Sequence, residues 1–259
     1  MRTNQIGLQL YTLRQETHHD LLGVLHRVHE IGYPAVEFAG LMEVEATLVR
    51  ATLDALGMEA AAAHVPVERW EKHLDAVLDE LITLGCAYGV VPWLAPEHRG
   101  SLEVTNRLVS LLNTCGAACK ERGIGLLWHH HDFEFEEMPG AGGRTMMDIL
   151  IEETDPATVG FEADLYWAVV GGQDPAAFLE RIAGRAKAVH MKDVGTVITE
   201  RGIPEDLPAG SGTLEWPRLI AVAEAAGAEW FIAEQDNPNM DDPIGDVRSA
   251  WTYLSGLAG

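Results

Sequence analysis

The feature that most restricts the fold is an alternation, along the whole chain, of short apolar runs with longer segments of helical periodicity. Each short run has the composition of a buried strand, with turn residues at its borders. The predicted strands are residues 6–13, 35–40, 59–65, 87–93, 125–131, 159–167, 186–193 and 229–236. Their even spacing indicates strands that are each followed by a helix.

The segments between the strands carry apolar residues at helical spacing. The clearest of these predicted helices are residues 21–31, 70–84, 102–119 and 219–226. Several helices are followed by a glycine, the usual residue after the last helical turn: Gly32, Gly57, Gly85, Gly123 and Gly227. Eight strands alternating with helices predict one (β/α)8 TIM barrel that forms a single domain over residues 1–259.

A doubly wound parallel sheet is the alternative fold. It would normally carry a glycine-rich turn after its first strand, and residues 11–14 (YTLR) contain no glycine. Two Gly/Pro-rich loops, residues 138–144 and 195–212, follow the fifth and seventh predicted strands. Because such loops lie at the mouth of a barrel, we expect lids there.

Composition restricts the partners and the compartment. The 259 residues carry a net charge of −22 and no basic run, so nucleic acid is not an expected partner. No apolar run reaches the ~18 residues that a membrane span requires. Three cysteines without C-x-x-C spacing and a start without a signal-peptide pattern predict a cytoplasmic protein.

Polar or aromatic residues end every predicted strand, whereas the strand bodies are largely apolar. In a TIM barrel the chemistry is located at these carboxyl-terminal ends. The residues concerned are Gln9, Tyr11, Glu37, His64, Trp93, His129, His131, Asp164, Trp167, His190, Lys192, Glu234 and Asp236. A barrel without a site would not need such a set.

Asp164, His190 and Glu234 come from three consecutive strands and converge on the barrel axis. Two carboxylates and an imidazole suit Mn²⁺, Co²⁺, Zn²⁺ or Fe²⁺, with positions left open for substrate or water. The alternative interpretation is an ion-pair network at the barrel mouth with Lys192 as its cation.

The run WHHHDFEF (residues 128–135) is the most unusual segment. Strand alternation places His129 and His131 on one face and His130 on the other. His129 and His131 therefore face the predicted site, and we expect His130 to make a structural hydrogen bond. A solvated histidine cluster without a function is the alternative.

Other strand-end residues are candidate substrate binders. Trp93 and Trp167 suit the apolar walls of a pocket for a sugar. Lys192 and Glu37 are candidate partners of substrate hydroxyl or carbonyl groups, and His64 is a further one.

Taken in order, these motifs resemble the xylose-isomerase-like TIM-barrel superfamily, which includes sugar phosphate isomerases/epimerases, inosose dehydratases and apurinic-site endonucleases. The resemblance covers essentially the whole chain. It rests on IGLQLYTLR, IGYPAVEFAG, WHHHDFEF, FEADLYW, VHMKD, GSGTLEW and AEQD. It implies one bound divalent ion, with Mn²⁺ as the first choice and Co²⁺, Zn²⁺, Mg²⁺ or Fe²⁺ as alternatives, and a homodimer or homotetramer.

The resemblance implies four metal ligands, and Asp164, His190 and Glu234 match the last three. At the first position His129 stands in place of a glutamate, so that the fourth ligand is either His129 or Glu134. A second departure is Trp167, where many members have a histidine. This loss of a histidine, together with the net charge of −22, argues against DNA repair.

The chemistry that the resemblance implies is proton abstraction next to a carbonyl, through an enediolate that the metal stabilises. Glu234 is the predicted base, His131 (or His129) the opposite acid/base, and Glu134 the reserve candidate. The first predicted function is a sugar or keto-sugar isomerase/epimerase with a small sugar or polyol substrate. The alternatives are a dehydratase of an inosose-like or keto-sugar substrate and a non-catalytic sugar-binding barrel.

Overall fold

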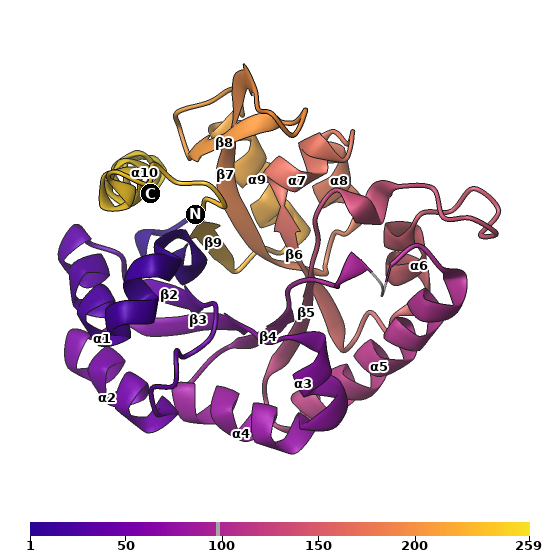
Figure 1. Cartoon of the computed structure of the whole chain (residues 1–259), viewed down its shortest axis with the longest axis horizontal. Coiled ribbons are helices and arrows are strands. Elements are labelled where there is room, and N and C mark those ends of the chain that lie inside the picture. Colours follow the sequence, from indigo (N-terminus) through magenta and orange to yellow (C-terminus); the bar gives the residue numbers. More distant parts are fainter. Residues whose placement is uncertain (97–98) are drawn as a thin grey trace.

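The computed structural model describes residues 1–96 and 99–259. Within these ranges eight parallel strands close into one barrel, which helices surround (Figure 1). The barrel strands are β1 (Ile6–Gln9), β2 (Ala35–Phe38), β3 (Glu59–His64), β4 (Tyr88–Val91), β5 (Gly125–His129), β6 (Val159–Asp164), β7 (Ala186–Ile198) and β9 (Trp230–Ala233). The predicted (β/α)8 fold is confirmed, because β9 pairs in parallel with both β7 and β1 and so closes the ring.

The helices form the outer layer of the molecule (Figure 1). They are α1 (Arg14–Ile31), α2 (Ala46–Leu56), α3 (Val67–Lys72), α4 (Leu74–Leu84), α5 (Leu102–Glu121), α6 (Met146–Glu153), α7 (Leu165–Val170), α8 (Pro175–Arg181), α9 (Trp216–Ala226) and α10 (Pro243–Leu257). Gly57, Gly85 and Gly227 follow their helices with positive φ, as predicted. Among the described residues, no helix combines the length and apolar character that crossing a membrane requires.

Two strands, β1 and β6, end earlier than the sequence pattern predicted, because a side chain at the strand end begins a helical turn. β1 ends at Gln9, whose side chain accepts a hydrogen bond from the Tyr11 N–H, and a 3₁₀ turn follows (Leu10–Leu13). β6 ends at Asp164, whose Oδ1 accepts the Trp167 N–H and caps α7. The predicted helix 70–84 is two helices, since His73 leaves the helical conformation at φ −140° and ψ 37°.

The prediction of a loop over residues 195–212 was wrong for much of this segment. β7 continues to Ile198 and pairs antiparallel with a further strand, β8 (Pro204–Pro208), so that a hairpin projects beyond the barrel (Figure 1). Asp193, which is fully buried, holds the segment that follows the hairpin, residues 209–216. Its carboxylate accepts hydrogen bonds from the N–H groups of Val194, Gly210 and Leu214 and from the Trp216 indole, each at 2.9 Å.

The barrel interior is arranged in layers because side chains alternate along each strand. A buried apolar layer contains Ala35, Ala62, Leu127, Ala188 and Ile232. Two positions further along the same strands stand Glu37, His64, His129, His190 and Glu234. The strands therefore place a polar layer directly above an apolar floor, at the carboxyl-terminal end of the barrel.

We expect Asp193→Ala to destabilise the protein by about 3–5 kcal/mol, because the substitution leaves four donors, two of them buried, without their acceptor. The free energy of unfolding in urea measures the loss. The exposed Asp54→Ala is the control and should change this free energy by less than about 0.5 kcal/mol, since Asp54 makes only a surface ion pair with Arg50. Equal effects of the two substitutions would contradict this interpretation of the hairpin.

Candidate metal centre

The predicted metal ligands Asp164, His190 and Glu234 lie together at the mouth of the barrel, and we call them the mouth triad. Each is buried, and they offer ligand atoms that lie within 4.8 Å of one another. His190 Nδ1 is 2.7 Å from Glu234 Oε2 and 3.7 Å from Asp164 Oδ2. Because Asp164 Oδ1 caps α7, the local backbone directs Oδ2 toward the triad.

Lys192 lies beside the mouth triad and is fully buried. Its Nζ is 2.7 Å from Glu234 Oε2, 2.6 Å from Asp236 Oδ2 and 3.0 Å from Asp164 Oδ2. Burial opposes the charge on this amine, but the surrounding carboxylates raise the pKa of Lys192 well above its ordinary value. The ammonium is therefore held ionised among three carboxylates, as the ion-pair alternative predicted.

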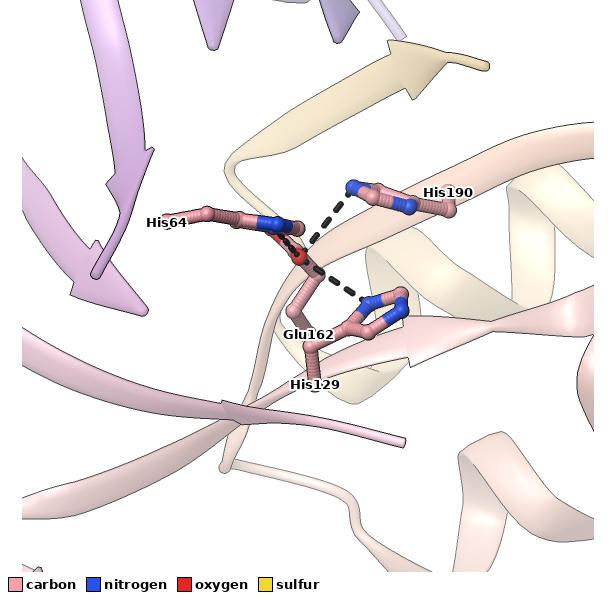
Figure 2. Close-up of side chains that lie close together, drawn as sticks. All are labelled: His64, His129, Glu162 and His190. Carbon is pink, nitrogen blue, oxygen red and sulfur yellow. Dashed lines mark hydrogen bonds and ion pairs between the residues drawn. The ribbon is translucent and has the colours of Figure 1, made fainter. Parts of the chain in front are cut away.

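A second group of side chains lies one step deeper in the barrel, and we call it the deep cluster: His64, His129, Glu162 and His190. Figure 2 shows three imidazole rings directed toward the carboxylate of Glu162. Glu162 Oε2 lies 2.8 Å from His64 Nε2 and 3.1 Å from both His129 Nδ1 and His190 Nε2. Burial opposes ionisation, but the histidines hold the pKa of Glu162 well below its usual range.

His190 belongs to both groups because its two ring nitrogens face opposite ways. Nδ1 faces the mouth carboxylates, and Nε2 lies 2.7 Å from Glu37 Oε2 and 3.1 Å from Glu162 Oε2. Burial disfavours protonation, yet the nearby glutamates raise the pKa of His190 well above its ordinary value. Without a metal, the ring is an imidazolium that bridges the mouth and the deep cluster.

The buried residues carry an excess of acidic over basic side chains, which favours a bound cation. Among the described residues, one lysine and no arginine is fully buried, against these buried acids: Glu37, Glu134, Glu162, Asp164, Asp193, Asp206 and Glu234. Asp193 and Asp206 are satisfied by backbone N–H groups, those of Gly210 and Leu214 for Asp193 and those of Asp236 and Asn237 for Asp206. Of the remaining acids, Glu162, Asp164 and Glu234 surround the barrel axis. Burial opposes their ionisation, but the neighbouring lysine and histidines hold their pKa values below the usual range, so they carry negative charge that a divalent ion would neutralise.

Buried carboxylate oxygens without hydrogen-bond partners also favour a bound cation at this site. Buried polar atoms are normally hydrogen-bonded. Among the described residues, four buried carboxylate oxygens have no hydrogen-bond partner: Glu37 Oε1, Glu134 Oε1, Glu162 Oε1 and Asp164 Oδ2. The last of these lies 3.0 Å from Lys192 Nζ, so it makes an ion pair without a hydrogen bond. Hard oxygen donors beside an imidazole fit a divalent transition-metal ion.

The two candidates for the fourth ligand lie in different surroundings. His129 is directed at Glu162 and belongs to the deep cluster. Glu134 is fully buried in the 3₁₀ turn after β5 (Phe133–Phe135), where Oε2 accepts the His131 N–H and Oε1 is unpartnered. Burial raises the pKa of Glu134 to about 8. The choice between His129 and Glu134 stays a prediction.

The three consecutive histidines divide as strand alternation predicted. His130 faces the surrounding helices, where its ring packs against Phe135 and Phe178 and its Nε2 accepts the Asp164 N–H. His131 lies just past the end of β5, with its ring 5.2 Å from that of Trp167. Burial lowers the pKa of His131 well below its ordinary value, so its ring is neutral.

The candidate substrate binders are not all at the mouth. Trp167 is buried beside it and donates its indole N–H to Asp236. Glu37 and His64 lie deeper, where Glu37 Oε2 accepts from Gln9 and His190. Trp93 is 45% exposed and packs on the Arg99 guanidinium, which also lies over the Phe133 ring.

Sequence reasoning missed Glu162. An acid within the body of an apolar strand is the signal that was available, because alternation places Glu162 on the same face as Asp164. In the sheet, Glu162 on β6 pairs with His129 on β5, and Asp164 on β6 pairs with His190 on β7. This register places Glu162 between the two histidines.

The fold and the site together define a TIM barrel with a carboxylate–histidine centre at its strand ends. The family described as xylose isomerase-like TIM barrel matches residues 25–254. The chain therefore belongs to the xylose isomerase-like TIM-barrel family, as its motifs indicated.

Curated relatives and solved structures are similar over most of their length. The inosose dehydratase of Geobacillus kaustophilus (strain HTA426) is 28% identical over 270 residues, which cover 90% of this chain and 86% of the relative. A sugar phosphate isomerase/epimerase from Parabacteroides distasonis superposes with a TM-score of 0.82 at 24% identity, covering 98% and 94% of the two chains. An AP endonuclease, family 2, from Brucella melitensis has a TM-score of 0.75 at 15% identity, covering 98% and 99%. The two structures support the fold.

We expect Lys192→Met to lower the stability of the metal-free protein by about 3–5 kcal/mol, because the buried carboxylates of Asp164 and Glu234 and the half-buried Asp236 lose their cation. We also expect added Mn²⁺ to raise the melting temperature of the variant more than that of the unsubstituted protein, since the ion replaces the lost charge. Thermal melts after chelation, with and without MnCl₂, measure both effects.

Lys187→Met is the matched control, because Lys187 lies on the same strand and makes only an exposed ion pair with Glu229. Its effect should stay within about 1 kcal/mol and should not depend on the metal. A Lys192→Met protein that gains no extra stability from Mn²⁺ would contradict a cation site at the mouth.

Proposed function

We propose that the protein is a metal-dependent lyase that removes water from an inosose-like cyclic ketone or a related keto-sugar. The observation that carries this proposal is the similarity, over 90% of the chain, to a relative named inosose dehydratase. Further relatives with the same name cover 88% of the chain at 24% and 23% identity. This favours the dehydratase alternative over the isomerase/epimerase that was expected first.

The geometry of β5 supports a reaction with one main base. Epimerisation by two metal-bound glutamates needs a carboxylate on each face of the reacting carbon. Here the matching position on β5 is His129, and its Nδ1 faces Glu162 in the deep cluster. With His129 as the fourth ligand, Glu234 is the one glutamate that binds the ion, which suits a reaction with one main base that breaks first a C–H bond and then a C–O bond.

Asp164, His190 and Glu234 would hold the divalent ion, with His129 or Glu134 as the fourth ligand. When bound, the ion supplies Lewis acidity toward the oxygens of the substrate. Trp167 forms an apolar wall for the ring of the substrate, and Lys192 provides a fixed positive charge beside it. Glu37 stays a candidate polar contact from deeper in the barrel.

The proton transfers are assigned to Glu234, His131 and Glu134. A base, Glu234 or the neutral His131 with its unpartnered Nδ1, takes the proton from the carbon next to the carbonyl. Glu134, which is largely protonated at neutral pH because burial raises its pKa to about 8, gives a proton to the departing β-hydroxyl. The hydroxyl leaves as water, and the electron pair of the broken C–H bond forms the C=C bond of an enone.

Nuclear magnetic resonance in D₂O tests the reaction with a purified inosose as the substrate. We expect signals of a dehydrated product, and we expect Asp164→Ala to abolish both metal content and turnover, because it removes a mouth ligand. Deuterium exchange at the carbon next to the carbonyl without loss of water would instead support the isomerase/epimerase. Binding of the ketone with neither change would support the non-catalytic sugar-binding barrel.

We expect Glu134→Gln to slow water loss by about 10²–10⁴-fold, the usual contribution of a general acid, while deuterium exchange at the same carbon continues. The amide keeps the size and the acceptor oxygen of the side chain but holds no acidic proton. Measuring the rates of water loss and of deuterium exchange in one NMR series separates the role of the general acid from that of the base. Equal loss of the two rates would show that Glu134 binds the ion or acts as the base.

A further inference from the structure

The deep cluster brings more nitrogen atoms to one oxygen than hydrogen bonding accounts for. Glu162 Oε2 has three ring nitrogens within 3.1 Å, from His64, His129 and His190. A carboxylate oxygen carries two lone pairs in its plane. His129 Nδ1 and Glu162 Oε1 are both buried without a hydrogen-bond partner.

The same atoms form a suitable ligand set for a metal. Three imidazole nitrogens and one carboxylate oxygen match the donors that Zn²⁺ and Co²⁺ accept. In a tetrahedral site with bonds of 2.0–2.1 Å, neighbouring ligand atoms are about 3.3 Å apart. The nitrogen–oxygen distances of 2.8 and 3.1 Å need only small outward shifts to reach this value.

His190 cannot serve two ions while its ring is neutral. A neutral imidazole has one lone pair on a ring nitrogen and one N–H. An ion at the mouth takes Nδ1, and the proton on Nε2 then bonds to Glu37 or Glu162. An ion in the deep cluster takes Nε2, and the proton on Nδ1 then bonds to Glu234.

We propose that His64, His129, Glu162 and His190 form a second metal site, selective for Zn²⁺ or Co²⁺, and that its ion competes with an ion at the mouth triad for His190. The nitrogen-rich deep site favours Zn²⁺ and Co²⁺, whereas the oxygen-rich mouth suits Mn²⁺. Zinc in the deep cluster thus expels manganese from the mouth. This site does not depend on the reaction catalysed.

Cobalt binding to the metal-free protein tests the deep site. Four-coordinate Co²⁺ with nitrogen ligands absorbs visible light more strongly than six-coordinate Co²⁺, so the absorption reports on the site. We expect Asp164→Asn to keep this absorption, because its deep ligands are intact. His64→Gln should weaken Co²⁺ binding at least about tenfold.

His29→Gln is the matched control, because His29 is exposed on α1. It should bind Co²⁺ like the unsubstituted protein, and circular dichroism checks that each variant is folded. Loss of the absorption in a folded Asp164→Asn protein, or its persistence in His64→Gln, would overturn the proposal.

Competition is tested with the Mn²⁺-loaded protein, in which electron paramagnetic resonance detects released Mn²⁺. We expect one equivalent of Zn²⁺ to release Mn²⁺ from the unsubstituted protein, and His64→Gln to need at least about tenfold more Zn²⁺. Equal release from both proteins would mean that Zn²⁺ simply replaces Mn²⁺ at the mouth.

If His64→Gln does not fold, crystals of the unsubstituted protein soaked in Zn²⁺ decide the question. An anomalous zinc peak enclosed by His64, His129 and Glu162 supports the proposal. A peak confined to Asp164 and Glu234 overturns it. None of these readouts uses turnover, so a failure here leaves the proposed dehydration untouched.

Discussion

The structure depends on the compensation of buried negative charge at the centre of the barrel. Asp164, Glu162 and Glu234 are each buried, and uncompensated carboxylates at such positions would protonate or unfold the chain. His190 and Lys192, two positions apart on β7, supply the positive charge. One strand therefore neutralises acids that come from the strands on both sides of it, and the polar layer can exist above an apolar floor.

His190 has the central position in this arrangement because its two nitrogens reach two different groups of acids. Toward the mouth it faces the carboxylates that suit a divalent ion. Toward the floor it faces Glu37 and Glu162, which fix the orientation of the ring. The proposed lyase activity uses Nδ1 of His190, which faces the mouth, and the proposed second metal site uses Nε2. The His190 ring therefore takes part in both.

Much of this could be predicted from the sequence, because strand alternation and strand-end position follow from local pattern. Eight apolar runs predicted the barrel, and Asp164, His190 and Glu234 were placed together because consecutive parallel strands end at the same rim. Glu162 was missed, since its role depends on the register between β5, β6 and β7. The hairpin of β7 and β8 was also missed, because its Gly/Pro-rich sequence is typical of a loop and its pairing is held by tertiary contacts of Asp193.

The sequence by itself determined the closed barrel, the strand faces of His129, His130 and His131, and the family to which the chain belongs. The periodicity of apolar residues is a local property, so it can be recognised without knowing which strands pair. Only the tertiary structure decided that His129 turns toward Glu162, that Lys192 lies among three carboxylates and that His190 bridges two clusters. These are distances between side chains from different strands, and they are set by the stagger and closure of the barrel, which no single segment of the chain encodes.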